Sequence, residues 1–144
     1  MFQISTRFRY GLRALVYITL KNESDRINLH EISINESISR KYLENIFKLL
    51  KKSKIIKSVR GREGGYALMK TPAEITLFEI ASAIEGGVVL VNCVDNEGFC
   101  ERTSECGVRN FWGDYQNYIK EYLSGITLAD ILEKYMKQGI NRIL

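Results

Sequence analysis

The fold of the first half of the chain is decided by Ile55-Ile56-Lys57-Ser58-Val59-Arg60-Gly61-Arg62-Glu63-Gly64-Gly65-Tyr66-Ala67-Leu68-Met69. Both ends of this stretch have the β-branched, aromatic and apolar composition of strands, and its centre has the glycine content of a tight turn. The stretch therefore predicts a β-hairpin with strands over 55–60 and 66–69. The glycines supply the backbone freedom that its tip requires.

Helical periodicity precedes the hairpin. Apolar residues recur at three- and four-residue steps over 4–20, and a short helix is expected over 29–33. Asn35-Glu36-Ser37 is typical of a turn, because short polar side chains there can bond their own backbone. Ser39 is then the expected N-cap of a longer helix. Two helices joined by a short turn and followed by a hairpin indicate a winged helix-turn-helix, whose second helix can enter the major groove.

Charge is distributed unevenly along the 144 residues, which carry a net charge of +4. Residues 1–72 contain 15 Lys and Arg against 6 Asp and Glu, whereas residues 73–144 contain 6 against 11. A basic half that also carries a winged helix-turn-helix predicts DNA binding. Arg60 and Arg62 lie at the hairpin tip, where a guanidinium can enter a minor groove. A solvated hairpin tip is the alternative for these two arginines.

The acidic half predicts further helices. Thr76-Leu77-Phe78-Glu79 is a capping box for a helix that stops at Gly86-Gly87, and Thr127-Leu128-Ala129-Asp130 caps a last short helix. Between them, a long helix over 107–123 carries a stripe of large apolar residues. A second copy of the chain would bury this stripe in a two-fold homodimer, and burial within the same chain is the alternative. The expected dimer interface consists of Val108, Phe111, Trp112, Tyr115, Ile119 and Tyr122.

All three cysteines of the chain, Cys93, Cys100 and Cys106, lie in one loop before the long helix. Three thiols cannot pair completely in disulfides, and the N-terminus has no export signal, so a reducing cytoplasm is expected. Clustered thiolates favour iron–sulfur clusters and zinc. The spacing matches neither a zinc ribbon nor a ferredoxin. The residues alone therefore leave three possibilities open: an iron–sulfur cluster, zinc, and free redox-active thiols.

Taken together, these segments resemble the IscR/NsrR-type regulators of the Rrf2 family. The likeness rests on Ile4-Ser5, Arg9-Tyr10-Gly11-Leu12-Arg13-Ala14-Leu15, Ser39-Arg40-Lys41-Tyr42-Leu43-Glu44, Val59-Arg60-Gly61-Arg62-Glu63-Gly64-Gly65-Tyr66, Ile75-Thr76-Leu77, Ala83-Ile84-Glu85-Gly86, the three cysteines and Trp112. It extends to about Lys134, and the Arg-Gly-x-x-Gly-Gly-Tyr motif of the hairpin is its most specific part. The resemblance implies a homodimer that binds a palindromic or semi-palindromic operator in double-stranded DNA, commonly as a repressor.

The resemblance also implies roles for single residues. It places Ser39, Arg40, Lys41, Tyr42 and Asn45 on the recognition helix and Arg60 at the minor-groove position of the wing. Tyr42 either contacts DNA or packs against the second helix, and Glu44 either accepts from cytosine N4 or faces solvent. The complete expected DNA-binding set is Ser39, Arg40, Lys41, Tyr42, Glu44, Asn45, Lys48, Arg60 and Arg62.

By the same resemblance, the three cysteines hold an iron–sulfur cluster, with 2Fe–2S favoured over 4Fe–4S. Family members supply a fourth ligand either as a His three residues after the last cysteine or as a carboxylate from the first helix of the second protomer. Those places are Arg109 and Arg9 here, and neither is an ordinary ligand because arginine stays protonated. His30 is the only histidine. It lies in the short helix and is interpreted as a surface or packing residue.

The expected architecture is mainly α with a small β-hairpin wing. It divides into a winged helix-turn-helix DNA-binding domain over 1–86, a cysteine loop over 87–106, and a dimerisation helix with a C-terminal helix over 107–144. The expected function is a cytoplasmic transcriptional regulator that senses iron–sulfur, redox or nitric oxide status. The alternative is a regulator without a cluster, controlled by thiol oxidation, a small ligand or a protein partner. Neither an enzyme nor a membrane protein is expected.

Overall fold

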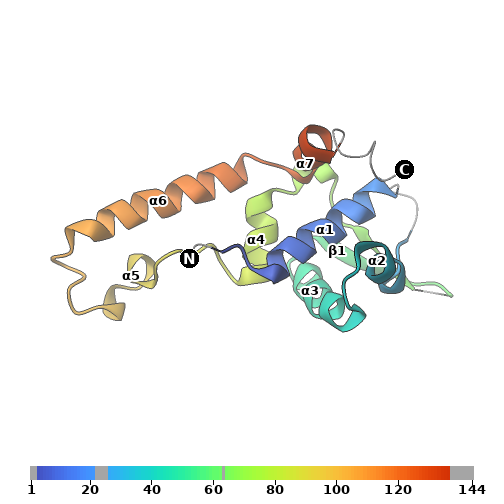
Figure 1. Ribbon diagram of the computed structural model, residues 1–144, viewed down its shortest axis with the longest axis horizontal. Coiled ribbons are helices and arrows are strands. Elements are labelled where there is room, and N and C mark those ends of the chain that lie inside the picture. The colour runs from blue at the N-terminus through green and yellow to red at the C-terminus, as the bar shows by residue number, and fades with distance from the viewer. Residues whose placement is uncertain (1–2, 22–25, 63, 137–144) are drawn as a thin grey trace.

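The computed structural model describes residues 3–21, 26–62 and 64–136 (Figure 1). Glu63 of the expected hairpin tip and residues 137–144 of the expected last region lie outside the described residues. The elements are, in order, α1 (Thr6–Leu20), α2 (Leu29–Glu36), α3 (Arg40–Lys52), β1 (Ile56–Val59), β2 (Gly65–Leu68), η1 (Pro72–Glu74), α4 (Leu77–Glu85), α5 (Asn92–Asp95), η2 (Glu97–Phe99), α6 (Gly107–Ser124), α7 (Leu128–Ile131) and the π-helical turn η3 (Leu132–Met136). Most of them pack into one body, from which α6 extends as an arm, with α5 beside its far part.

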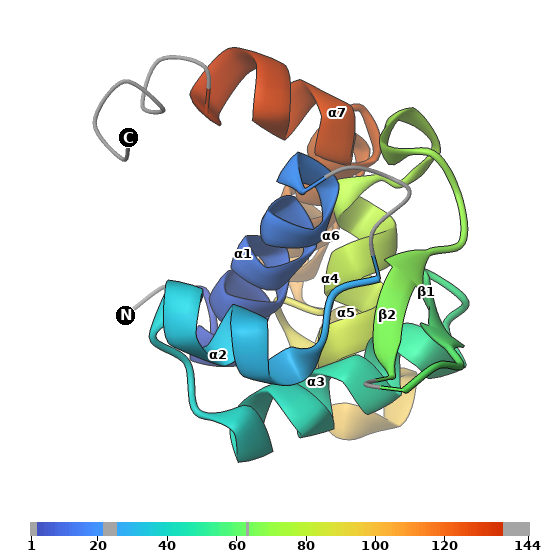
Figure 2. The same cartoon turned by 90° about the vertical axis from the view of Figure 1, so that its right-hand side faces the viewer.

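The centre of the body is the crossing of α1 with α3 and α4 (Figure 2). Gly11 of α1 permits this close approach, because a Cβ there would collide with Ile84 of α4 and lie 3.2 Å from Cγ2 of Ile46 of α3. Leu15 and Ile80 are fully buried beside this crossing. The core of the body thus lies directly behind the helix-turn-helix and holds α3 in place.

The helix-turn-helix consists of α2 and α3. The expected N-cap of α3 is confirmed, because the hydroxyl of Ser39 accepts a hydrogen bond from the Tyr42 amide at 3.3 Å. The expected turn at Asn35-Glu36-Ser37 is wrong in position, since α2 continues through Glu36 and the chain turns at Ser37, which has a left-handed φ of 53°. The last turn of α2 is stabilised from α1, where Arg13 donates to both the carbonyl and the carboxylate of Glu36.

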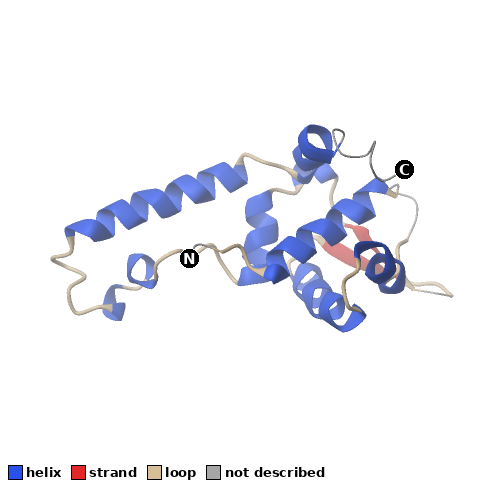
Figure 3. Ribbon diagram, viewed as in Figure 1, coloured by secondary structure: helices blue, strands red, loops and turns tan. Residues whose placement is uncertain are grey.

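The predicted hairpin is confirmed, with β1 and β2 pairing antiparallel from Ile56 opposite Leu68 to Val59 opposite Gly65. Figure 3 shows these two strands as the only sheet of the described residues. Ile27, just before α2, adds an isolated bridge beside β2, exchanging two backbone hydrogen bonds with Tyr66 at 2.9 and 3.3 Å. The wing is therefore attached to the body along its second strand as well as at its base.

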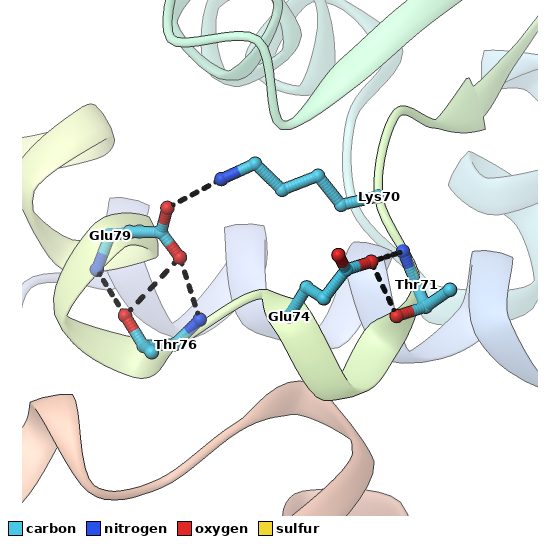
Figure 4. A network of polar contacts seen from close by, with 5 residues as sticks. All are labelled: Lys70, Thr71, Glu74, Thr76 and Glu79. Carbon is cyan, nitrogen blue, oxygen red and sulfur yellow. Dashed lines mark hydrogen bonds and ion pairs between the residues drawn. The ribbon is translucent and has the colours of Figure 1, made fainter.

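Two capping boxes in succession lead from the wing into α4 (Figure 4). The first joins Thr71 and Glu74 at η1, and the second joins Thr76 and Glu79 at α4, as predicted. Lys70, which follows the wing, donates to Glu79 at 2.8 Å. This hydrogen bond, together with that from the Thr76 amide, lowers the pKa of Glu79. The exit of the wing is thereby fastened to the first turn of α4.

The start of α7 is fastened to the same place. The Leu77 amide donates to the Ile126 carbonyl, and the Leu128 amide donates to the Ile75 carbonyl, both at 2.8 Å. The predicted capping box of Thr127 and Asp130 is confirmed, and Leu128 is fully buried in the core of the body. The segment after α6 thus packs on the DNA-binding body. Within the described residues, no helix combines the length and the apolar character needed to cross a membrane.

Candidate nucleic-acid interface and cysteine arm

An open cleft of about 1230 Å³ separates α3 from the wing. Arg40, Glu44 and Lys48 line it from α3, at four-residue steps along one helical face. The remaining lining residues are Asn28, Leu29, His30, Ser58, Val59, Arg60, Gly61, Gly64, Gly65 and Tyr66. The structure therefore brings together the recognition-helix cations and Arg60, which the sequence places far apart. Three permanent cations against one carboxylate make this cleft suited to a phosphate backbone.

A second depression, of about 500 Å³, lies on the opposite side of α3. Tyr42 and Asn45 line it together with Ser5, Thr6 and Arg7 from the start of α1. Tyr42 is half-buried, and its ring packs edge-on against Tyr10 at a centroid distance of 5.7 Å. Tyr42 is thus a packing residue, but its partner is the first helix and not the second.

Some of the polar side chains on the exposed face of α3 pair with each other, and others have no charged partner among the described residues. Arg40 and Glu44 form an ion pair at 3.3 Å, which places a hydrogen-bond donor and an acceptor side by side on this face. Lys41 and Lys48 are exposed without a carboxylate partner among the described residues. Ser39 is also exposed, although its hydroxyl caps the helix. Arg62 is exposed at the wing tip.

The cysteine arm, residues 92–124, contains the three cysteines and α6. Cys93 lies half-exposed in α5, and Cys100 and Cys106 are exposed. Arg109 of α6 reaches back to the loop, where its Nε donates to the Cys93 carbonyl at 2.8 Å and its Nη2 donates to the Val94 carbonyl at 3.3 Å. The Arg109 guanidinium also lies 3.7 Å from the carboxylate of Glu97. Arg109 therefore holds the first half of the loop against α6.

Gln116 is a second attachment point of the loop and is almost fully buried in α6. Its side-chain oxygen accepts from the Leu90 amide at 2.9 Å, and its nitrogen donates to the Asp95 carboxylate at 2.9 Å. Every polar atom of this amide is engaged, as a buried polar group requires. The loop thus rests on α6 through these polar contacts and through Val94, which is half-buried beside Gly113.

The arrangement of the thiols does not by itself form a metal site. Three thiols are the donors that iron–sulfur clusters and zinc prefer. Yet no three Cys, His, Asp or Glu side chains among the described residues are grouped to hold a metal ion. Arg109, at the position where the resemblance implies a ligand, is engaged with backbone carbonyls of the loop. The described residues therefore do not form a preassembled three-cysteine site, and cluster binding stays a prediction.

Helix α6 carries an exposed apolar stripe. Its members are Val108, Phe111, Tyr115, Tyr118 and Tyr122, which are 37% to 64% exposed. They alternate at steps of three and four residues, the repeat with which one helix packs along another. Trp112 and Ile119 of the expected interface are half-buried on a different side of the helix. Tyr118 was missed by the sequence analysis, although its spacing of seven residues from Phe111 could have indicated it.

Residues 4–134 match the Rrf2 family, described as an iron-dependent transcriptional regulator. This chain belongs to the Rrf2 family. The HTH-type transcriptional regulator IscR of Cronobacter sakazakii is 32% identical over 130 residues, which cover 90% of this chain and 80% of that protein. The structure of T. potens IscR is 28% identical and superposes with a TM-score of 0.74, covering 92% of this chain and 88% of that one. CymR, the global cysteine regulator of B. subtilis, is 30% identical with a TM-score of 0.73, covering 91% and 96%.

These matches confirm the predicted winged-helix fold and the family resemblance. The Rrf2 chain is a DNA-binding transcriptional regulator, as are the relatives it resembles, and not an enzyme. His30 is exposed and lines the cleft, which agrees with its interpretation as a surface residue. Arg26, which was not predicted, contacts the wing. No local signal identifies Arg26, because its contacts lie more than 30 residues away in the sequence.

Proposed function

We propose that this Rrf2 regulator binds, as a homodimer, a palindromic or semi-palindromic operator and represses transcription there. The observation that carries the proposal is the cleft in which α3 faces the wing across exposed Arg40, Lys48 and Arg60. A duplex that receives α3 in its major groove presents its phosphates to this cleft and its adjacent minor groove to the wing tip. In the proposed complex the DNA-binding domain is 1–86.

The residues of the proposed interface differ in whether they contact phosphates, base edges or the minor groove. Lys48 contacts phosphate, because an exposed ammonium with no carboxylate partner is free for a point contact. The Arg40–Glu44 pair presents a donor and an acceptor to base edges, so that Glu44 accepts from cytosine N4. Arg60 enters the minor groove. Ser39, Lys41 and Arg62 extend phosphate contact beyond the cleft, and Asn45 contacts phosphate from the other side of α3, where it lines the second depression.

The homodimer is formed through α6. Five exposed apolar residues at the repeat of a helix pair support this assignment, because a monomer would leave them in water. Two-fold pairing places two copies of α3 on two half-sites of one operator. In this proposal the region 107–144 comprises the dimerisation helix and a C-terminal helix, and the region 87–106 is the cysteine loop that serves regulation.

For regulation, the proposal is an iron–sulfur cluster on Cys93, Cys100 and Cys106, with 2Fe–2S favoured. The support is the family match to an iron-dependent regulator and the presence of three accessible thiols on one loop. Such a cluster would supply a centre sensitive to redox change and nitric oxide. A regulator of this kind acts in the cytoplasm. The separated thiols favour a second candidate: regulation by thiol oxidation, a small ligand or a protein partner, without a cluster.

DNA binding is tested with a duplex that the wild-type protein selects from random-sequence DNA. We expect Lys48→Ala to weaken binding to selected and unrelated duplexes alike and to reduce the salt dependence by about one phosphate contact. Arg60→Ala should instead lower the preference for the selected duplex. Lys134→Ala, which removes an exposed cation of η3, is the control and should change neither. Equal behaviour of all three variants would contradict the proposed interface.

The cluster is tested by anaerobic purification, followed by absorption spectroscopy and by iron and sulfide analysis of wild type and Cys93→Ala. Visible charge-transfer bands with matching iron and sulfide, absent from the variant, are the expected result. A colourless wild-type protein after anaerobic reconstitution would reject the cluster and leave the second candidate. Reversible oxidation of the thiols, followed by mass spectrometry and operator binding, then tests that candidate.

A further inference from the structure

The tip of the wing is held by a residue that lies outside the hairpin. The guanidinium of Arg26 donates to the carbonyl of Arg60 at 3.2 Å. Arg26 precedes Ile27, which pairs with Tyr66 of β2 through two backbone hydrogen bonds. The Tyr66 ring, one strand pair away from the last pair before the tip, packs edge-on against Phe47 of α3 at a centroid distance of 4.8 Å. The strand next to the tip is thus fixed by aromatic packing, and the tip itself by Arg26.

Two glycines of the wing leave room for this contact. A Cβ at Gly61 would occupy the position of the Arg26 guanidinium. A Cβ at Gly65 would lie 2.9 Å from Cβ of Arg26 and 3.3 Å from the Ile27 carbonyl oxygen. The absence of side chains at these two positions is therefore what lets Arg26 lie directly across the wing.

The side chain of Arg26 has a backbone carbonyl as its hydrogen-bond partner. Arg26 is exposed, and among the residues that the structure describes it pairs with no carboxylate. Its recorded partner is a backbone carbonyl, so the contact fixes the path of the chain at Arg60. Arg26 is exposed, and it donates to the backbone carbonyl of Arg60, the residue whose side chain is expected in the minor groove. This contact indicates that Arg26 positions Arg60.

We propose that Arg26 is a positioning residue for the wing: it fixes the backbone at Arg60 and thereby aims the Arg60 side chain at the minor groove. The inference rests on the proposed DNA contact of the wing. Ordering the wing before DNA arrives lowers the entropy that binding would otherwise cost. Arg26 therefore raises operator affinity through Arg60, without a DNA contact of its own.

The anchoring half of the proposal is tested in the DNA-free protein by amide hydrogen exchange. The Gly64 amide, which donates to the Gly61 carbonyl at 3.1 Å, reports on the tip. We expect Arg26→Ala to speed its exchange about tenfold, as the loss of one hydrogen bond to a charged group would. Gly61→Ala, which displaces the guanidinium, should have the same effect, and Arg26→Lys an intermediate one. The Leu77 amide in the body is the control. Unchanged exchange at Gly64 in both alanine variants would overturn the proposal.

The positioning half is tested by a double-mutant cycle on the selected duplex. In the wild-type background, we expect Arg26→Ala to weaken binding about tenfold with an unchanged salt dependence. In the Arg60→Ala background, the same substitution should have no effect on binding. Equal losses in both backgrounds, with a salt dependence reduced by one contact, would show that Arg26 binds phosphate directly and would overturn positioning. No loss in either background would overturn it as well.

Failure of the proposed DNA contact is recognised separately. If Arg60→Ala binds the selected duplex as wild type does, the wing does not read DNA, and the role of Arg26 in binding is rejected along with it. The exchange rates then still show whether Arg26 holds the tip.

Discussion

At the scale of single residues, Tyr17 shows how burial and a charged neighbour act together. Its ring is buried in α1, and its hydroxyl donates to the carboxylate of Glu31 in α2 at 2.8 Å. Burial and this carboxylate both disfavour the phenolate, and they raise the pKa of Tyr17 to about 12. The hydrogen bond ties the first helix of the body to the first helix of the helix-turn-helix.

The raised pKa of Tyr17 predicts an alkaline loss of stability. Because the folded state prefers the protonated phenol, this contribution is complete below about pH 10 and is lost as the pH rises toward 12. We expect Tyr17→Phe to be about 1 kcal/mol less stable than wild type at pH 8, through loss of the hydrogen bond. The difference should shrink above pH 10 in urea denaturation. Tyr10→Phe, which removes a half-buried hydroxyl elsewhere on the same helix, is the control, and a difference that is independent of pH would contradict the prediction.

The residue types of the interface could be read from the sequence, but several of their contacts could not. Arg40, Lys48 and Arg60 were predicted because a helix-turn-helix and a wing each have a fixed exposed face. The contact of Arg26 with the wing depends on Ile27 pairing with β2, which no local pattern encodes. Arg109 was predicted to be no ligand. The hydrogen bond from Arg109 to the Cys93 carbonyl could not be predicted, because it depends on the loop folding back on α6.

At the scale of elements, the helix starts were the most predictable features. Ser39, Thr76 and Thr127 all cap the helices they were expected to cap, because a cap is a local interaction of a side chain with nearby amides. The helix ends were less predictable. The end of α2 depends on Arg13 of α1, which is distant in sequence. The short helices α5 and η2 within the cysteine loop were not predicted, because no apolar repeat marks them.

Removal of the α4 cap should weaken the whole body. We expect Thr76→Ala to lower the free energy of unfolding by about 1 kcal/mol, since the Glu79 amide loses its acceptor at the point where α4 and α7 join. Thr71→Ala at the exposed η1 turn should lower the free energy of unfolding by less and serves as the comparison.

The lowered pKa of Glu79 adds stability above its unfolded pKa, and this stability is lost as the pH falls below about 4. Urea denaturation at pH 7 and pH 3 measures both effects, and equal losses in the two variants would argue against a special role for Thr76.

The exposed stripe of α6 yields a prediction about assembly. We expect Phe111→Glu and Tyr118→Glu to convert a dimer into a monomer with an unchanged helical content, because both side chains are more than half exposed within one chain. Asn117→Glu, an exposed change on the polar side of the same helix, should leave the dimer intact. Sedimentation velocity measures the outcome. A wild-type monomer, or dimers in all variants, would remove α6 from the interface.

At the scale of the whole molecule, the charge asymmetry and the architecture coincide. The basic residues 1–72 build the face that contains α3 and the wing, while the acidic residues 73–144 include the arm. In the proposed complex, this separation would orient the molecule in the field of DNA before contact, with the acidic arm directed away from the polyanion. The return of α7 to the core could not be predicted from the sequence. That return depends on Leu128, whose burial is a tertiary property.

The polar attachment of the cysteine loop has a thermodynamic consequence. Arg109 and Gln116 hold the loop by hydrogen bonds, and most side chains over 95–106 are already in water. Detaching the loop would therefore newly hydrate chiefly the half-buried Val91, Cys93 and Val94, and its heat-capacity change would be far below that of global unfolding. The Leu90 amide donates a hydrogen bond to the side-chain oxygen of Gln116, so its hydrogen-exchange rate reports on loop opening. This rate should then be nearly independent of the urea concentration. The free energy of opening such a loop changes nearly linearly with temperature, without the curvature that a large heat-capacity change gives to global unfolding.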